Sequence, residues 1–301
     1  MAGYFPPDSM ARNALSQRAV GLTYGQRALT IGATHPRLFQ GTAQSTTHRD
    51  RPFTRLSLTA RLFEAVFLGS REEADRALAF TAKRHVPVRG TIEQSGGPRH
   101  PAGAPYDAHD PGLMWWTAAF ILDSVEHQHD ELVRRLTDHE RERLFADFVT
   151  WAELFGMPRE AAPADYTAYR SQFDAYLASD EPYLTEEARL VGRYVSGYVV
   201  PNAPPLPARP FFAGIHLLVI GSLPERVREL FEMNWTLADR AAYAAATRGS
   251  RLAHRRPVAT LGAPVLRGRS REFYAVVARG ERAVLRRGRP SMPGVSDRVP
   301  A

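Results

Sequence analysis

Histidine is the side chain of this sequence best suited to bind a metal, because the 301 residues include ten histidines and no cysteine. Without cysteine there is no disulfide, no iron–sulfur cluster, no cysteine-ligated zinc and no thiol nucleophile. Any metal must therefore bind through histidine or a carboxylate. The sequence also lacks the GxGxxG, P-loop, GxSxG and HExxH motifs, so the enzyme classes that use them lose their support.

One histidine, His85, stands out by its position. It ends an amphipathic segment, where free carbonyl groups and the helix dipole favour a basic imidazole. Position alone leaves two interpretations open, a C-capping histidine and a metal ligand. His35 and His216 adjoin or lie within apolar runs, so we expect them to be buried core residues. The others occupy polar stretches, turns or the basic C-terminal segment and are expected at the surface: His48, His100, His109, His127, His129, His139 and His254.

Helical patterns surround these residues. Apolar side chains at helical spacing predict a helix over residues 53–67, opened by Pro52 and closed by Gly69. A capping box at Ser70 starts the next helix, which should end near His85 because Pro87 disfavours helical geometry at the residue before it. A second capping box begins at Thr137, and Thr185 followed by two glutamates marks another helix start.

Apolar and loop segments complete the expected organisation. The apolar stretches 112–122 and 211–220 are too short to span a bilayer and predict buried helices. Segments 95–105 and 201–210, rich in Pro and Gly, predict long loops, and we see no convincing alternating strands. The sequence therefore predicts an all-α fold, a single bundle-like domain of many helices.

Charge is unevenly distributed along the chain. Residues 248–301 hold 13 arginines against three acidic residues, a balance of +10, although the whole chain carries only +7. This segment has neither interleaved aromatic residues nor a nucleic-acid motif, so we interpret it as a solvated surface extension and expect no nucleic-acid partner. The N-terminus shows no targeting signal and no apolar run could span a membrane, so we expect a cytoplasmic protein.

Several short segments, taken together in their order and spacing, resemble one known family over roughly residues 20–236. They are Gly25–Leu29, His35-Pro36, Gly41, Arg55–Thr59, Phe67–Gly69, Glu73-Ala74, His85–Gly90, Tyr106–Pro111, Trp116, Asp123-Ser124, Leu154–Pro158, Leu223-Pro224 and Arg228. The sequence is similar in these segments to the all-helical family of the MpaB-type oxygenases and the latex-clearing rubber oxygenases.

The resemblance implies a cofactor and a set of site residues. Characterised members of the family bind haem b and use dioxygen to cleave carbon–carbon double bonds of isoprenoid chains. It implies that His85 is the axial iron ligand and that Arg55, Thr59 and Arg89 lie near the haem. Arg55 and Thr59 are four residues apart and so share one helix face. There the arginine could pair with a propionate or polarise oxygen, and the threonine could donate a hydrogen bond; the other interpretation is an exposed Arg55 above a helix-packing Thr59.

Two positions depart from the family pattern. Ala118 stands where many members have a histidine, and Leu58 stands where the rubber-cleaving branch has a lysine. Neither is the implied axial ligand, so these departures bear on the oxygen chemistry and not on haem binding.

We therefore expect an oxygenase-like helical domain over residues 1–247 and an arginine-rich extension over residues 248–301. The implied function is a haem b-dependent oxygenase acting, with dioxygen or peroxide, on a small apolar substrate of isoprenoid or aromatic type. The alternative is a non-catalytic helical protein that binds an apolar ligand without haem.

Overall fold

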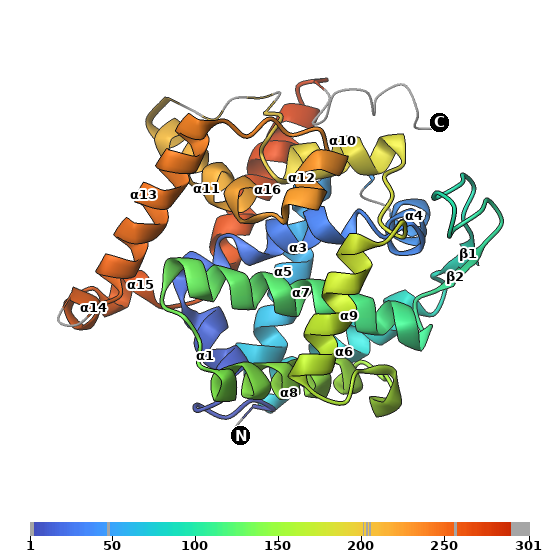
Figure 1. Ribbon diagram of the computed structural model, residues 1–301, viewed down its shortest axis with the longest axis horizontal. Helices are drawn as coiled ribbons and strands as arrows, with labels where there is room; N and C mark the ends of the chain where they lie inside the picture. The colour runs from blue at the N-terminus through green and yellow to red at the C-terminus, as the bar shows by residue number, and fades with distance from the viewer. Residues whose placement is uncertain are drawn as a thin grey trace.

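Helices form almost all of the regular structure in the computed structural model, which describes residues 3–46, 49–200, 202, 204, 206–255 and 258–289 (Figure 1). The α-helices are α1 (Met10–Ser16), α2 (Arg18–Gly21), α3 (Tyr24–Gly32), α4 (Pro36–Ser45), α5 (Pro52–Leu68), α6 (Arg71–His85), α7 (Pro111–Leu132), α8 (Asp138–Leu154), α9 (Tyr166–Ala178), α10 (Glu186–Val195), α11 (Arg209–Ser222), α12 (Glu225–Leu230), α13 (Leu237–Ala253), α14 (Val258–Leu261), α15 (Ala263–Leu266) and α16 (Arg271–Leu285). Short 3₁₀ turns lie at Arg159–Ala161 and Leu206–Ala208. The predicted all-α class is confirmed.

The sequence did not predict the small β-hairpin of this fold. Strands β1 (Arg89–Thr91) and β2 (Pro105–Asp107) pair antiparallel, with Arg89 opposite Asp107. Each strand has three residues, which is too short to show an alternating pattern. The loop between the strands contains most of the segment 95–105 that was predicted to be a loop.

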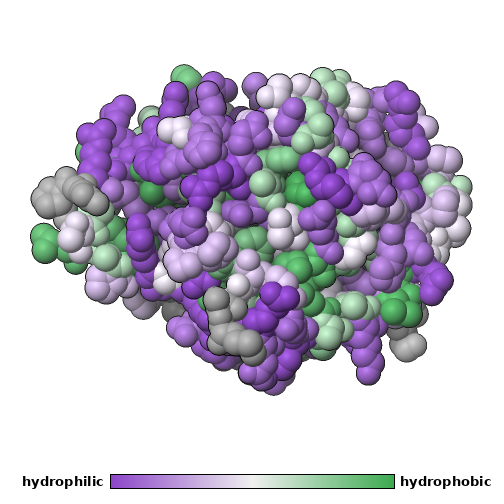
Figure 2. Space-filling view, turned by 90° about the horizontal axis from the view of Figure 1, so that it is seen from below, coloured by the Kyte–Doolittle hydropathy of each residue, from purple (hydrophilic) through white to green (hydrophobic). Residues whose placement is uncertain are grey.

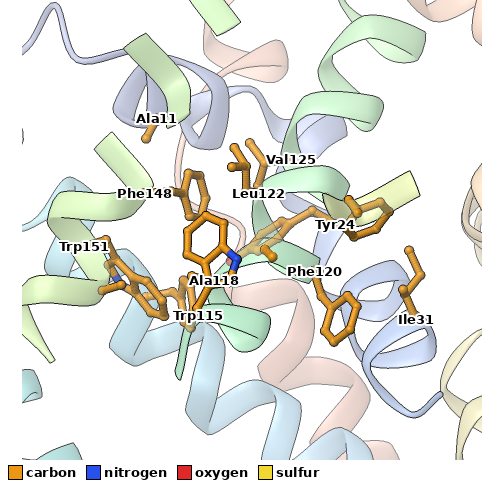
Figure 3. Packing of buried hydrophobic residues seen from close by; sticks show 14 of the residues in the cluster. Ala11, Tyr24, Ile31, Trp115, Ala118, Phe120, Leu122, Val125, Phe148 and Trp151 are labelled. Carbon is orange, nitrogen blue, oxygen red and sulfur yellow. The ribbon is translucent and has the colours of Figure 1, made fainter. Parts of the chain in front are cut away.

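Helix α7 is the centre of the packing. It contacts α3, α8 and α13 along its length, and Figure 1 shows it crossing the middle of the molecule. Trp115 and Leu122 of α7 are at most 1% exposed and pack in the core with Phe148 of α8 (Figure 3). Burying each such side chain stabilises the fold by about 1.5–3 kcal/mol. The apolar stretch 112–122 is thus a buried helix, as predicted.

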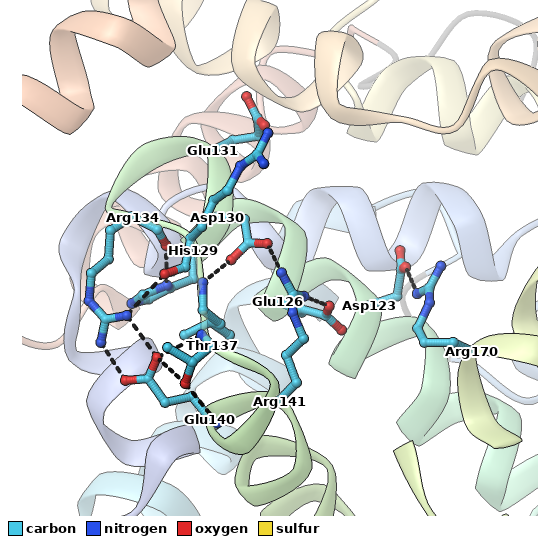
Figure 4. A network of polar contacts seen from close by, with 12 residues as sticks. Asp123, Glu126, His129, Asp130, Glu131, Arg134, Thr137, Glu140, Arg141 and Arg170 are labelled. Atoms are coloured by element: carbon cyan, nitrogen blue, oxygen red, sulfur yellow. Dashed lines mark hydrogen bonds and ion pairs between the residues drawn. The ribbon is translucent and has the colours of Figure 1, made fainter. Parts of the chain in front are cut away.

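Two charged residues of α7, Asp123 and Glu126, are also buried, and both have partners (Figure 4). The carboxylate of Asp123 accepts hydrogen bonds from Nη1 of Arg27 in α3, at 2.5 Å, and from Nη1 of Arg170 in α9, at 2.7 Å. Burial alone would raise the pKa of Asp123, but the two guanidinium groups outweigh it and hold that pKa below its ordinary value. One turn further on, Arg141 of α8 bridges Glu126 and Asp130.

This arrangement corrects the expectation that His127 and His129 are solvated. Both lie on α7 beneath neighbouring helices, and His129 is 3% exposed with Nδ1 3.0 Å from the carbonyl of Arg134. Burial lowers the pKa of His127 to about 3 and that of His129 to about 4. The polar sequence around them suggested exposure, but ion pairs allow a helix with this sequence to be buried.

The burial of the other histidines agrees with the prediction in some cases and differs from it in others. His35 is buried as expected, and His109 and His139 are exposed. His100 was expected at the surface but is only 8% exposed, because the loop between the strands folds it inward. His254 is half-buried, and its Nδ1 lies 2.8 Å from the carbonyl of Ser250. His48 falls outside the described residues.

Helices α5 and α6 form an antiparallel pair with the predicted boundaries. Gly69 joins them, and a Cβ there would lie 2.4 Å from the carbonyl oxygen of Ala65, so a larger residue does not fit this turn. The capping box of Ser70 and Glu73 begins α6 as predicted. The helix ends at His85, yet Val86 keeps helical backbone angles, with φ −46° and ψ −46°. The helix therefore stops because Pro87 has no N–H to donate, not because Val86 is extended.

The C-terminal segment is partly integrated into the fold. Helix α13 runs through the expected boundary at residues 247/248, and α16 packs lengthwise against α5 with Tyr274 and Glu281 buried. The carboxylate of Glu281 accepts hydrogen bonds from the backbone N–H groups of Phe53 (3.1 Å) and Thr54 (2.7 Å) at the start of α5. The expectation of a solvated segment is thus wrong for α16. Residues 290–301 lie outside the described part.

The surface is mainly hydrophilic on the face shown in Figure 2, where apolar side chains appear in separate groups. Exposed apolar residues include Leu261 of α14 and Val265 of α15. Within the described ranges, no helix has both the length and the apolar character that a membrane span requires.

Replacing Glu281 with alanine should destabilise the protein by about 2–3 kcal/mol, because two buried N–H groups of α5 would lose their acceptor. Denaturant unfolding followed by circular dichroism measures this change. The matched control is Glu272→Ala, an exposed glutamate of the same helix, which should cost less than about 1 kcal/mol. Equal effects of the two substitutions would show that the hydrogen bonds from α5 to the Glu281 carboxylate contribute little.

Candidate functional site

The antiparallel pairing of α5 and α6 places Arg55 beside His85. Arg55 precedes Gly69 by 14 residues and His85 follows Ser70 by 15. With a rise of 1.5 Å per residue, both residues lie about 21–22 Å from the turn, on neighbouring helices. In agreement with this proximity, the positive charge of Arg55 is one of the causes that lower the pKa of His85.

His85 presents a neutral imidazole at the end of α6. Its side chain is exposed, yet enough protein surrounds the ring that partial burial, followed by the charges of His109 and Arg55, lowers its pKa below the ordinary value. The His85 and His109 rings lie 6.5 Å apart, centroid to centroid. A neutral imidazole at physiological pH is the form that binds a metal.

Arg55 is a half-buried cation without an anionic partner. No hydrogen bond or ion pair of its guanidinium is found among the residues that the structure describes. Burial lowers its pKa to about 10, so it still carries its charge at neutral pH. Because most partly buried arginines of this protein pair with carboxylates, as Arg170 and Arg141 do, Arg55 is available to bind an anion.

The remaining predicted residues lie close by in the chain. Thr59 follows Arg55 by one turn of α5 and is exposed, so the interpretation as a helix-packing threonine does not hold. Leu58, next to it, is 44% exposed. Arg89, also exposed, donates from Nη2 to the carbonyl of Val86 at 3.3 Å, which fixes it to the turn that follows His85.

His109 and Asp107 were not predicted to be near His85. The hairpin pairs β1, which follows α6, with β2, and so carries the segment after β2 back to the end of α6. There Nδ1 of His109 lies 3.4 Å from Oδ1 of Asp107. A signal was present in the sequence, since Tyr106–Pro111 is one of the segments that carry the family resemblance.

His216 and Ala118, one of the two positions that depart from the family pattern, lie in different surroundings from His85. His216 on α11 is only half-buried, not a core residue as expected. Burial lowers its pKa to about 4, and its ring packs so closely on Gly197 that a Cβ there would lie 2.1 Å away. Ala118 is fully buried in the apolar core around Trp115 (Figure 3). Trp116 packs instead against Tyr176, with ring centroids 4.6 Å apart.

The arrangement combines a neutral nitrogen donor with unpaired positive charge. His85 offers a metal-ligand atom, and Arg55 and Arg89 offer guanidinium groups that bind carboxylates with two parallel hydrogen bonds. Such a site suits a ligand that carries both a metal and carboxylate groups.

Replacing Arg55 with glutamine should raise the pKa of His85, because a positive charge that disfavours the imidazolium form is removed. The pH dependence of the histidine ring signals in NMR spectra measures this shift. Arg61→Gln is the matched control, since Arg61 is exposed on the same helix. An unchanged pKa in Arg55→Gln would contradict the proximity of the two side chains.

Comparison with known proteins identifies the family. A family model described as the catalytic domain of ER-bound oxygenase mpaB/B' and rubber oxygenase matches residues 12–252. No curated protein and no solved structure matches the chain significantly. The match covers α2 to α12, and with them Arg55, Thr59, His85 and Arg89, together with most of α1 and α13. The protein therefore belongs to the MpaB/rubber oxygenase family of oxygenase catalytic domains.

Proposed function

We propose that the protein is a haem b-dependent oxygenase that uses dioxygen or peroxide to oxidise a small apolar molecule of isoprenoid or aromatic type. The observation that carries this proposal is the unpaired Arg55 guanidinium beside the neutral imidazole of His85. Membership of an oxygenase family supports the reaction class. The use of haem as cofactor and the kind of substrate go beyond family membership and belong to this proposal.

The described residues fit a haem. Haem b presents an iron that takes an axial imidazole and two propionates that need cationic partners. His85 would hold the iron, while Arg55 and Arg89 would pair with propionates. When bound, the haem supplies the iron centre at which dioxygen or peroxide reacts.

The protein's own contribution to the reaction comes from α5. Arg55 keeps its charge at neutral pH and stabilises negative charge that develops beside it. Thr59, one turn away, offers a hydroxyl that donates or accepts one hydrogen bond. Leu58, next to Thr59, supplies no polar side-chain atom, so the polar contribution of this region depends on Arg55 and Thr59. The exposed side chain of Leu58 suits an apolar substrate.

His85→Ala should abolish stoichiometric haem binding and leave the helical content unchanged, because a metal ligand is lost from an exposed position. The absorption spectrum with its Soret band, measured per mole of chain, tests this expectation. His139→Ala, an exposed histidine on α8, is the control and should bind haem as the unmodified protein does.

Two results would contradict the proposal in different ways. Full haem occupancy with an unchanged spectrum in His85→Ala would show that another residue binds the iron. A colourless purified protein that added haemin does not change would favour the alternative, a helical protein that binds an apolar ligand without catalysis.

Arg55→Ala should lower turnover by about 10²-fold, the effect of losing one positioned donor, with a smaller effect on haem binding. Thr59→Val should lower turnover less, by about tenfold or under. Both variants, reconstituted with haem, would be compared with the Arg61→Ala control on prenylated and aromatic substrates. Loss of haem in step with activity would limit the role of Arg55 to propionate binding, and unchanged activity would place the reaction elsewhere.

A further inference from the structure

A second cluster of potential metal ligands lies apart from the residues proposed to hold the haem. It joins His35 at the N-cap of α4, His100 in the loop between β1 and β2, and Glu181 after α9. Glu181 Oε1 lies 3.9 Å from His35 Nε2 and 3.8 Å from His100 Nε2, and the three candidate ligand atoms are all within 4.8 Å of one another. Three segments far apart in the sequence thus direct donor atoms to one point.

These distances suit a metal better than hydrogen bonds. At 3.8–3.9 Å the nitrogen and oxygen atoms are too far apart to bond directly. Around a tetrahedral ion with ligand bonds of about 2.0–2.1 Å, neighbouring donor atoms lie about 3.3 Å apart. The two nitrogen–oxygen distances would contract by about half an ångström around such an ion, and the distance between the two imidazole nitrogens, which is at most 4.8 Å, would contract by up to about 1.5 Å.

Burial provides an independent observation. His35 is 2% and His100 is 8% exposed, and His100 Nε2 is buried with no hydrogen-bond partner in the described structure. Buried polar atoms of this kind almost always have a partner. The unsatisfied nitrogen is the same atom that faces Glu181, so an ion between them would satisfy it.

We propose that His35, His100 and Glu181 bind one divalent transition-metal ion of the Zn²⁺ or Fe²⁺ class. Two imidazoles and one carboxylate are a ligand set typical of these ions, whereas Mg²⁺ and Ca²⁺ prefer oxygen ligands alone. The side chain of Glu181 is 34% exposed, so a water molecule can reach the fourth position. This site does not depend on the proposed haem.

Direct contacts between neighbouring residues hold the three ligand segments together. The N–H of Tyr183, two residues after Glu181, donates to the carbonyl of Thr34 at 2.8 Å, next to His35. Arg99, next to His100, donates from Nε to Oδ1 of Asp180 at 2.7 Å. Each contact joins residues next to, or two positions from, two of the ligands, so the three ligands are held near one another without an ion.

Tight packing fixes the loop that carries His100. A Cβ on Gly96 would lie 2.2 Å from Cβ of Pro36, so this glycine allows the loop to approach the start of α4. Gly97 has φ +92°, which glycine alone adopts without strain, and the ring of Tyr183 packs against it. On the other side, the ring of Tyr176 stacks on His35 with an interplanar angle of 13°.

The charge state of the cluster suits metal binding. Burial, followed by the charges of His100 and Arg37, lowers the pKa of His35 to about 3, and burial followed by Arg37 lowers the pKa of His100. Both imidazoles are therefore neutral near pH 7 and present lone pairs. Burial raises the pKa of Glu181, so a cation beside this carboxylate would stabilise its charged form.

Metal binding has one local cost. His35 Nδ1 accepts a hydrogen bond from the N–H of Leu38 at 3.5 Å, at the outer limit for such a bond. Binding through Nε2 places the ring proton on Nδ1, so this long bond is given up. A weak N-capping bond is thus exchanged for a metal-ligand bond.

The test measures metal affinity in the full-length protein after treatment with EDTA and dialysis. Zn²⁺ is titrated in competition with a chromophoric chelator, and Co²⁺ is added separately to record the absorption bands of a tetrahedral site. We expect one Zn²⁺ per chain with a Kd of about 1 μM or below, and affinity about 100-fold lower or worse in Glu181→Gln and in His100→Ala.

Matched variants separate this site from the haem proposal. His139→Ala and His85→Ala should bind Zn²⁺ as the unmodified protein does, whereas only His85→Ala should lose haem. If His100→Ala loses its helical circular dichroism signal, Glu181→Gln decides the outcome, since its partly exposed amide keeps the shape of the side chain. Absence of stoichiometric Zn²⁺ and Co²⁺ binding, or equal Zn²⁺ affinity in Glu181→Gln, would overturn the proposal.

Discussion

A single buried carboxylate connects the central helices of this protein. Asp123 of α7 receives Arg27 from α3 and Arg170 from α9, and Arg27, only 2% exposed, also donates from Nε to the carbonyl of Ser222 at the end of α11. Removing one member of such a buried set leaves an unpaired charge, which costs several kcal/mol. The positions of four helices relative to one another therefore depend on these contacts, and the apolar core forms around them.

The sequence predicts local features of the fold well because they depend on short-range chemistry. The start and end of α5 and α6 follow from Pro52, Gly69 and the capping box at Ser70, and these boundaries also place Arg55 level with His85. Burial of polar residues is harder to predict. His129 and His100 occur in polar segments, and only the partners brought by other helices or by a folded loop show that they are inside.

The two clusters of histidines also differ in how far the sequence predicts them. The surroundings of His85 combine a helix pair with a short hairpin, and a family resemblance marks most of the residues involved. The other cluster joins residues 35, 100 and 181, whose spacing matches no motif. No local pattern could have found it, because its geometry arises from a backbone hydrogen bond, an ion pair and two glycines in contact with other segments.

The position of Glu281 on α16 has a consequence for when α5 can fold during synthesis. Glu281 caps the first turn of α5, directly before Arg55, although 228 residues separate it from Phe53. The ribosome therefore completes α5 and α6 long before their cap exists. Until α16 emerges, the N–H groups of Phe53 and Thr54 lack this acceptor, so the first turn of α5, which carries Arg55, takes its final form only after α16 has been synthesised.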